Sequence, residues 1–207
     1  MKAFIYTGGR INKQNITEHP KSDDICIAAD SGYKNAKVLG EKVDVLLGDF
    51  DSIGEPLPDG IKVITVPAEK DFTDTQLAVQ TALDMGANEI VIVGGLGGRL
   101  DHTLANLGLL QKLGDMRVHA VATDGYNRVR YINGSSTLIA KSQYKYVSVL
   151  PIDKKIKGVD IEGCKYPLKN ATLMRDDTLA VSNEVTGNCA LISVRKGACY
   201  IIESVDE

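Results

Sequence analysis

The sequence of 207 residues lacks the features typical of membrane, disulfide-rich and nucleic-acid-binding proteins. No apolar run approaches the roughly 18 residues that span a bilayer, so we expect no membrane segment. The net charge of −3 is too small, and of the wrong sign, to favour nucleic acid or an anionic membrane surface. The four cysteines form no C-x-x-C pair. We therefore expect reduced thiols and a cytoplasmic protein.

What is present is typical of an ordinary soluble globular chain, with 43% apolar and 25% charged residues. The opening MKAFIYTGGR favours a strand and a glycine turn over a signal peptide, because it has no long apolar region. A chain of this length buries roughly 70% of its unfolded surface, which is enough for one large domain or two small ones.

Residues 1–124 alternate short apolar runs with helix-like segments. The predicted strands are KAFIYTG (2–8), DICIAAD (24–30), DVLLGDF (44–50), KVITVP (62–67), EIVIVGG (89–95) and RVHAVATD (117–124). Continuous apolar runs are typical of strands in a parallel sheet that is covered on both faces. The predicted helices are SGYKNAKVLG (31–40), TDTQLAVQTALDMG (73–86) and LDHTLANLGLLQKLG (100–114). We predict an α/β domain with a mostly parallel sheet and helices on both faces.

Residues 125–207 show a different pattern, with short runs separated by Gly, Asn, Asp and Lys turns and no convincing helix. The predicted strands are RVRYING (128–134), STLIA (136–140), YKYVSVLPI (144–152), GVDIEG (158–163), DTLAVS (177–182), CALISVRKG (189–197) and ACYIIES (198–204). This spacing predicts an all-β sandwich or small barrel as a second domain.

Acids, glycines and basic residues follow several predicted strands of the first domain. Ligands of open α/β sheets bind outside the carboxyl ends of the strands, so these residues should share one edge. They are Asp30, Asp49, Asp51, Lys70, Asp71 and the stretch GGLGGRLD at 94–101. Each signal alone has a structural explanation: a D-x-D pair can form a turn, and acids at a helix start suit the helix dipole.

Together the aspartates supply several hard oxygen ligands. Asp49, Asp51 and Asp74 suit Mg²⁺, which takes one or two carboxylates and completes its shell with water and substrate phosphates. Lys70, Arg99 and the glycine N–H groups would then contact the phosphates. These residue types therefore favour a magnesium and phosphate site.

Five motifs resemble those of thiamine pyrophosphokinases and occur in the order seen in that family. They are AADSG (28–32), LLGDFDS (46–52), EKDFTDTQLAV (69–79), GGLGGRLDHTLAN (94–106) and VSNEVTG (181–187). The resemblance covers nearly the whole chain. It implies a homodimeric enzyme that converts ATP and thiamine to thiamine diphosphate and AMP.

The resemblance also implies roles for individual residues. It assigns the metal to Asp49, Asp51 and Asp74, the nucleotide to Asp30, Gln76 and Arg99, thiamine to Asp101, and a thiamine pocket across the dimer interface to Ser182 and Asn183. Animal members of the family stack thiamine on a tryptophan, and this chain has no tryptophan.

The expected reaction is attack of the thiamine hydroxyl on the β-phosphorus of ATP. It needs mainly positioning and charge neutralisation. Asp71 or Asp101 would orient the hydroxyl or accept its proton, and the sequence leaves both open. Asp101 could instead stabilise the cationic thiazolium ring.

Two other functions are also consistent with the sequence. The acidic edge also suits another Mg-dependent nucleotidyl- or glycosyltransferase. Alternatively, the chain is a non-catalytic nucleotide-binding module whose β domain serves for docking.

Overall fold

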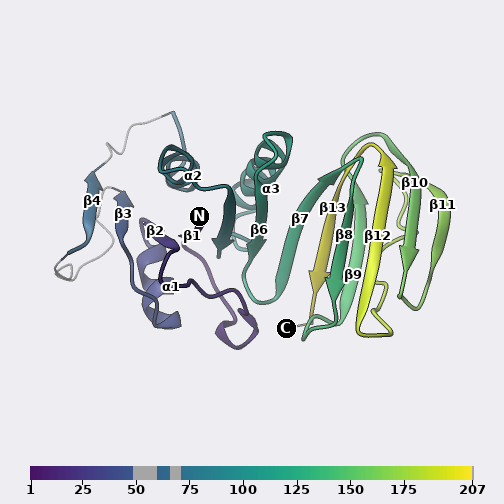
Figure 1. Cartoon of the computed structure of the whole chain (residues 1–207), viewed down its shortest axis with the longest axis horizontal. Helices are drawn as coiled ribbons and strands as arrows, with labels where there is room; N and C mark the ends of the chain where they lie inside the picture. The colour runs from purple at the N-terminus through teal and green to yellow at the C-terminus, as the bar shows by residue number, and fades with distance from the viewer. Residues whose placement is uncertain (49–59, 66–70, 207) are drawn as a thin grey trace. The chain divides into compact units, whose positions relative to one another are not determined.

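The computed structural model describes residues 1–48, 60–65 and 71–206 (Figure 1). The chain forms two compact units, Met1–Gly125 and Tyr126–Glu207. Within the described ranges, no helix is long and apolar enough to cross a membrane.

The first unit is built on a parallel sheet with the strand order β4-β3-β2-β1-β5-β6. Its strands are β1 (Lys2–Tyr6), β2 (Ile25–Ala29), β3 (Val45–Gly48), β4 (Lys62–Thr65), β5 (Glu89–Val93) and β6 (His119–Thr123). Every residue of β2 and β3 is buried, as the continuous apolar runs predicted. From β1 the chain adds strands on one side up to β4, and β5 then returns to the other side of β1. The strand order therefore reverses between β1 and β5, where α/β proteins bind ligands.

Helices cover both faces of this sheet (Figure 1). They are α1 (Gly32–Leu39), α2 (Asp74–Asp84) and α3 (Leu100–Asp115), and a short 3₁₀ turn, η1, covers Lys13–Asn15. Tyr33 and Ala36 of α1 pack in one cluster with Phe4, Cys26 and Leu46 of the sheet. The helices α2 and α3 lie next to each other over the sheet and cover it with Ala78, Val79, Leu110 and Leu113 among their buried residues.

The second unit contains two antiparallel groups of strands. One has the order β7-β13-β9 and the other β11-β10-β12-β8. The strands are β7 (Asn127–Asn133), β8 (Ser136–Ala140), β9 (Tyr146–Pro151), β10 (Lys155–Glu162), β11 (Leu168–Met174), β12 (Cys189–Lys196) and β13 (Ala198–Ser204).

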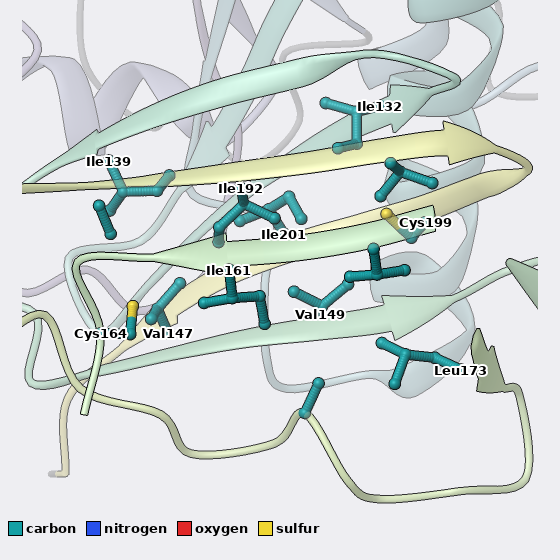
Figure 2. Close-up of a cluster of buried hydrophobic side chains, with 14 of the residues drawn as sticks. Ile132, Ile139, Val147, Val149, Ile161, Cys164, Leu173, Ile192, Cys199 and Ile201 are labelled. Carbon is teal, nitrogen blue, oxygen red and sulfur yellow. The ribbon is translucent and has the colours of Figure 1, made fainter. Parts of the chain in front are cut away.

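Apolar side chains from both groups of strands meet in one core (Figure 2). Ile139, Ile161 and Ile192 come from one group, and Val149 and Ile201 from the other. Each such side chain contributes about 1.5–3 kcal/mol when it is fully buried. The predicted fold class, an α/β sheet with helices on both faces followed by a β sandwich, is confirmed.

One strand prediction in the second unit is wrong. Residues 177–182 form turns, because the Asp177 carboxylate accepts a hydrogen bond from the Leu179 N–H at 3.1 Å and the Val181 N–H donates to the Thr178 carbonyl at 3.1 Å. The strand β11 was not predicted. Only Leu173 of β11 is buried, so its sequence carries almost no hydrophobic pattern.

Candidate functional site

A cavity of about 420 Å³ opens at the carboxyl ends of β1, β2 and β5, where the strand order reverses. The starts of α2 and α3 complete its wall. Its lining is polar and rich in glycine: Thr7, Gly8, Gly9, Ala29, Asp30, Ser31, Phe72, Thr73, Asp74, Thr75, Gly95, Gly97, Gly98, Arg99, His102 and Asn106. Helix starts and glycine-rich turns present backbone N–H groups, so this cavity suits an anionic ligand.

The glycine-rich loop between β5 and α3 is fixed by a buried asparagine. Asn106, which is 5% exposed, donates from Nδ2 to the Gly95 carbonyl at 2.9 Å. Gly95 has a φ of +69°, and a Cβ there would lie 2.5 Å from Asn106 Nδ2 and 2.8 Å from Thr7 Oγ1. Only glycine fits this position, so the loop backbone lies directly against its supports.

The start of α3 holds the other end of the same loop. The Thr103 hydroxyl accepts a hydrogen bond from the Gly97 N–H at 3.0 Å and lies 3.3 Å from the Arg99 carbonyl. Asn35 of α1 ties the neighbouring loop after β1, since its Nδ2 donates to the Thr7 carbonyl at 2.7 Å and the Gly9 carbonyl at 3.0 Å. The two loops that line the cavity are therefore both anchored by side-chain amides.

Two carboxylates among the described residues contribute to the cavity wall. Asp30 follows β2 in a left-handed conformation with a φ of +48°, and its N–H donates to the Leu47 carbonyl at 2.7 Å. Asp74 is the first residue of α2, whose start is capped by the Thr73 hydroxyl accepting from the Gln76 N–H at 3.2 Å. Asp30 and Asp74 are both half-buried, so their charges act with less screening than exposed carboxylates would.

Arg99 also lines the cavity and is paired with Asp101. Its Nε lies 3.2 Å from Asp101 Oδ1 and its Nη2 lies 2.6 Å from Oδ2. The Asp101 carboxylate also accepts the His102 N–H at 2.9 Å. The hydrogen bonds from Arg99, and then that from His102, lower the pKa of Asp101 to about 2. Asp101 itself is not part of the cavity lining, although it is held at the cavity's edge by Arg99.

Two further predicted residues of the first unit that the structure describes do not line this cavity. Asp71 is exposed and Gln76 is half-buried, and neither belongs to the lining. Asp49, Asp51 and Lys70 lie outside the described residues. Among the residues that are described, no three His, Cys, Asp or Glu side chains are grouped so that they could hold a metal ion.

Ser182 and Asn183 lie in the second unit and differ in environment. Asn183 is buried; its Oδ1 accepts from the Tyr166 N–H at 3.0 Å, and its Nδ2 donates to the Tyr166 carbonyl at 2.8 Å. Ser182 is exposed and left-handed, with a φ of +59°, and its N–H donates to Ser148 Oγ at 3.0 Å. The Asn183 amide therefore fixes the backbone at Tyr166, while the Ser182 side chain is accessible to a ligand.

Several cavity residues were not predicted from the sequence. Thr7, Phe72, His102 and Asn106 all line the cavity. The position of Asn106 could have been predicted, because it ends the motif GGLGGRLDHTLAN and lies two helical turns after Arg99, on the same side of the helix. Thr7 follows the first strand directly, as Asp30 follows the second.

Two family models match the chain. The model described as "Thiamin pyrophosphokinase, catalytic domain" matches residues 17–122, and "Thiamin pyrophosphokinase, vitamin B1 binding domain" matches residues 136–199. The first match includes Asp30, Asp74 and Arg99, and the second includes Ser182 and Asn183.

Similar proteins support the same grouping. The chain is 32% identical over 209 residues to the thiamine pyrophosphokinase of Bacillus subtilis (strain 168), covering 98% of each chain. It is 30% identical over 169 residues to thiamin pyrophosphokinase 1 of Caenorhabditis elegans, covering 77% of this chain and 69% of that one.

Solved structures resemble the whole chain. A crystal structure of thiamine pyrophosphokinase from Bacillus subtilis has a TM-score of 0.88 and 29% identity, with 100% of both chains covered. One from Geobacillus thermodenitrificans has a TM-score of 0.84 and 28% identity, with 100% of this chain and 99% of that chain covered.

Proposed function

Because the chain belongs to the thiamine pyrophosphokinase family, it is an enzyme that transfers the pyrophosphoryl group of ATP to the hydroxyl of thiamine, and we propose that the cavity of the first unit holds the ATP phosphates. The observation that carries this assignment is the composition of the cavity wall. It combines glycine N–H groups, the starts of α2 and α3, the Arg99 guanidinium and two carboxylates at the point where the strand order reverses.

A divalent metal fits the donors in this cavity. Asp74, at the start of α2, offers a half-buried carboxylate at the cavity wall. Asp30, directly after β2, offers a second. Hard carboxylate oxygens beside a phosphate site are what Mg²⁺ takes in proteins. We assign the ion to Asp74 with Asp49 and Asp51; when bound, it would neutralise charge on the ATP phosphates.

The protein's own groups position the reacting atoms. Arg99 would exchange part of its pairing with Asp101 for phosphate oxygens, at little cost because both side chains are exposed and water screens the pair. The thiamine oxygen forms a bond to the β-phosphorus, the bond from that phosphorus to the α,β-bridging oxygen breaks, and AMP leaves. The N–H groups of Gly95 and Gly97 already donate to the Gly8 carbonyl and the Thr103 hydroxyl, so other N–H groups of this loop would hold the phosphates in line for this displacement.

The hydroxyl proton needs an acceptor, and the pairing of Asp101 with Arg99 argues against Asp101, which leaves Asp71 of the two candidates. While Arg99 is bound to it, Asp101 has a pKa of about 2 and is a weak base. Its persistent negative charge suits the cationic thiazolium ring instead. We therefore expect Asp71→Asn to lower kcat and Asp101→Asn to raise the KM for thiamine. An unchanged thiamine KM in Asp101→Asn would remove Asp101 from the thiamine site.

The second unit would bind thiamine through the segment at Ser182 and Asn183, in a homodimer whose thiamine site lies at the subunit interface. An exposed apolar pair supports a subunit contact: Leu138 of β8 and Leu191 of β12 are cross-strand partners and are 61% and 40% exposed. The four cysteines are free thiols, which supports the proposed reducing, cytoplasmic location.

One assay tests the function directly. The purified protein, incubated with thiamine, ATP and Mg²⁺, should form thiamine diphosphate and an equal amount of AMP, and should form neither when thiamine is omitted. Transfer from a nucleotide sugar, or ATP binding without AMP formation, would support the transferase or binding-module alternatives. Neither alternative gains support from the proteins that resemble this chain.

A further inference from the structure

The second unit has a pocket of about 370 Å³ whose described lining includes three cationic side chains and no acidic one. Its walls are Lys157, Gly158, Asn170, Thr172, Arg195 and Lys196. They come from the strands β10, β11 and β12, and none of them belongs to the cavity of the first unit. Small-molecule sites typically measure 300–1,000 Å³, so this pocket has the size for a small anion.

The two lysines of the pocket face each other across a strand pair. Lys157 of β10 and Lys196 of β12 are register partners in an antiparallel ladder. Like charges directly opposite each other destabilise a sheet. Within the described part of the chain, neither lysine forms an ion pair with a carboxylate.

The third cation, Arg195, is held in place by its surroundings. Its side chain lies across Gly158, where a Cβ would lie 2.6 Å from Arg195 Nη2 and would also clash with Nε. The same Nη2 donates a hydrogen bond to Asn170 Oδ1. Gly158 has a φ of +65° and sits at a register shift of β10, so the bulge makes room for the guanidinium.

Asn170 is itself fixed in an uncommon conformation. Its φ is +48°, and its N–H donates to Asp160 Oδ1 at 2.7 Å. A left-handed non-glycine residue persists only when its surroundings hold it. Asn170 thus links Arg195 to the neighbouring strand and keeps the guanidinium beside the two lysines.

We propose that this pocket binds a phosphorylated small molecule through its phosphate groups and is a second anion site of the chain. A bound diphosphate would neutralise the facing lysines, and the Arg195 fork would bind its oxygens in a fixed direction. Thr172, the register partner of Lys157 on β11, adds a hydroxyl donor. The small pocket and the net charge of −3 favour a small anion over a nucleic acid as the ligand.

Inorganic pyrophosphate is the probe, and backbone amide NMR of the full chain is the readout. Titration without Mg²⁺, ATP and thiamine makes the result independent of turnover. We expect saturable shifts of the Gly158, Asn170 and Arg195 amides. Shifts confined to the first unit would overturn the second site and leave the nucleotide assignment intact.

Two double variants that remove the same charge distinguish a specific phosphate site from general electrostatic attraction between pyrophosphate and the protein. Lys157→Gln/Lys196→Gln should weaken pyrophosphate binding at these amides about tenfold or more, because both lysines are expected to contact the phosphates. Lys42→Gln/Lys112→Gln removes the same charge; both lysines are exposed and lie in the first unit, outside this pocket. Equal weakening in both variants, or in neither, would overturn the site.

A stability measurement provides a second readout. Removing the facing lysines relieves their repulsion, so Lys157→Gln/Lys196→Gln should fold and have a Tm at least as high as the wild type. Pyrophosphate should raise the wild-type Tm more than sodium chloride of equal ionic strength does, and should lose this excess in the variant. An equal rise in both proteins would contradict the proposal.

Discussion

Arg99 and Asp101, two residues apart at the start of α3, form a two-bond ion pair with distances of 3.2 and 2.6 Å. Arg99 lines the cavity assigned to the ATP phosphates, and Asp101 is the residue assigned to thiamine. The pair therefore joins the residues assigned to the two substrates. While it is intact, it favours the charged form of Asp101.

The first prediction concerns the titration of this pair. The hydrogen bonds from Arg99, and then that from the His102 N–H, lower the pKa of Asp101 from 3.8 to about 2. The stabilisation that this charged carboxylate contributes is therefore complete above pH 3.8 and is lost as the pH falls through about 2. In Arg99→Gln the pKa of Asp101 should rise towards 3.8. A carboxyl ¹³C NMR titration of both proteins measures it. Identical midpoints would show that Arg99 does not set this pKa.

The second prediction concerns the metal-binding role of Asp74. Asp74→Asn keeps the size of the side chain and should lower kcat about 100-fold or more, because it removes a carboxylate from the phosphate site. Asp84→Asn is the matched control: Asp84 is at the other end of α2, is exposed, and accepts only a local bond from Gln80 at 2.9 Å. Near-normal turnover of Asp74→Asn would remove Asp74 from the metal site.

The third prediction concerns the glycine-rich loop. Gly95→Ala should weaken ATP binding and lower the Tm, because the new Cβ would displace Asn106 and Thr7 at a backbone φ of +69°. Gly108→Ala is the control within α3, where a Cβ meets nothing within 4 Å. That variant should be stabilised by about 0.5–1 kcal/mol. Calorimetric ATP titration and thermal melts measure both, and unchanged ATP affinity in Gly95→Ala would contradict the role of the loop.

The fourth prediction concerns the buried charge of the second unit. Glu203 is 2% exposed and lies 2.9 Å from Arg130 Nη2 and 3.5 Å from Arg128 Nη1. Glu203→Gln removes a buried carboxylate that faces Arg128 and Arg130 and should cost about 3–5 kcal/mol of unfolding free energy, because it breaks a buried ion pair. Urea unfolding measures this loss, and a loss below about 1 kcal/mol, the range of exposed pairs, would contradict it.

The sequence predicted the fold well where burial imposes a pattern. The continuous apolar runs of β1, β2, β3 and β5 identified the parallel sheet, and alternation with glycine turns identified the second unit as β. It failed at β11 and at residues 177–182. Most side chains of β11 are not buried, so its sequence lacks the hydrophobic pattern of a strand. At residues 177–182 the Asp177 side chain closes a turn within a segment whose apolar residues resemble a strand.

The site was partly predictable for a related reason. Strand ends placed Asp30 and Arg99 at one cavity, and the helix start placed Asp74 there. Asn106 and Thr7 were missed because their contribution is to support the loop backbone through contacts that depend on the folded helix. The role of Asn183 was also invisible in the sequence, since its amide binds the backbone of Tyr166, 17 residues away.

The cavity where β1, β2 and β5 end is assigned to the ATP phosphates. Mn²⁺ substituted for Mg²⁺ broadens the NMR signals of nearby amides, so adding Mn²⁺ with ATP locates the nucleotide's metal directly. We predict selective broadening of the Asp74, Gly95 and Gly97 amides, with the amides of β10 unaffected. Sharp signals at those three residues with broadening elsewhere would contradict the assignment.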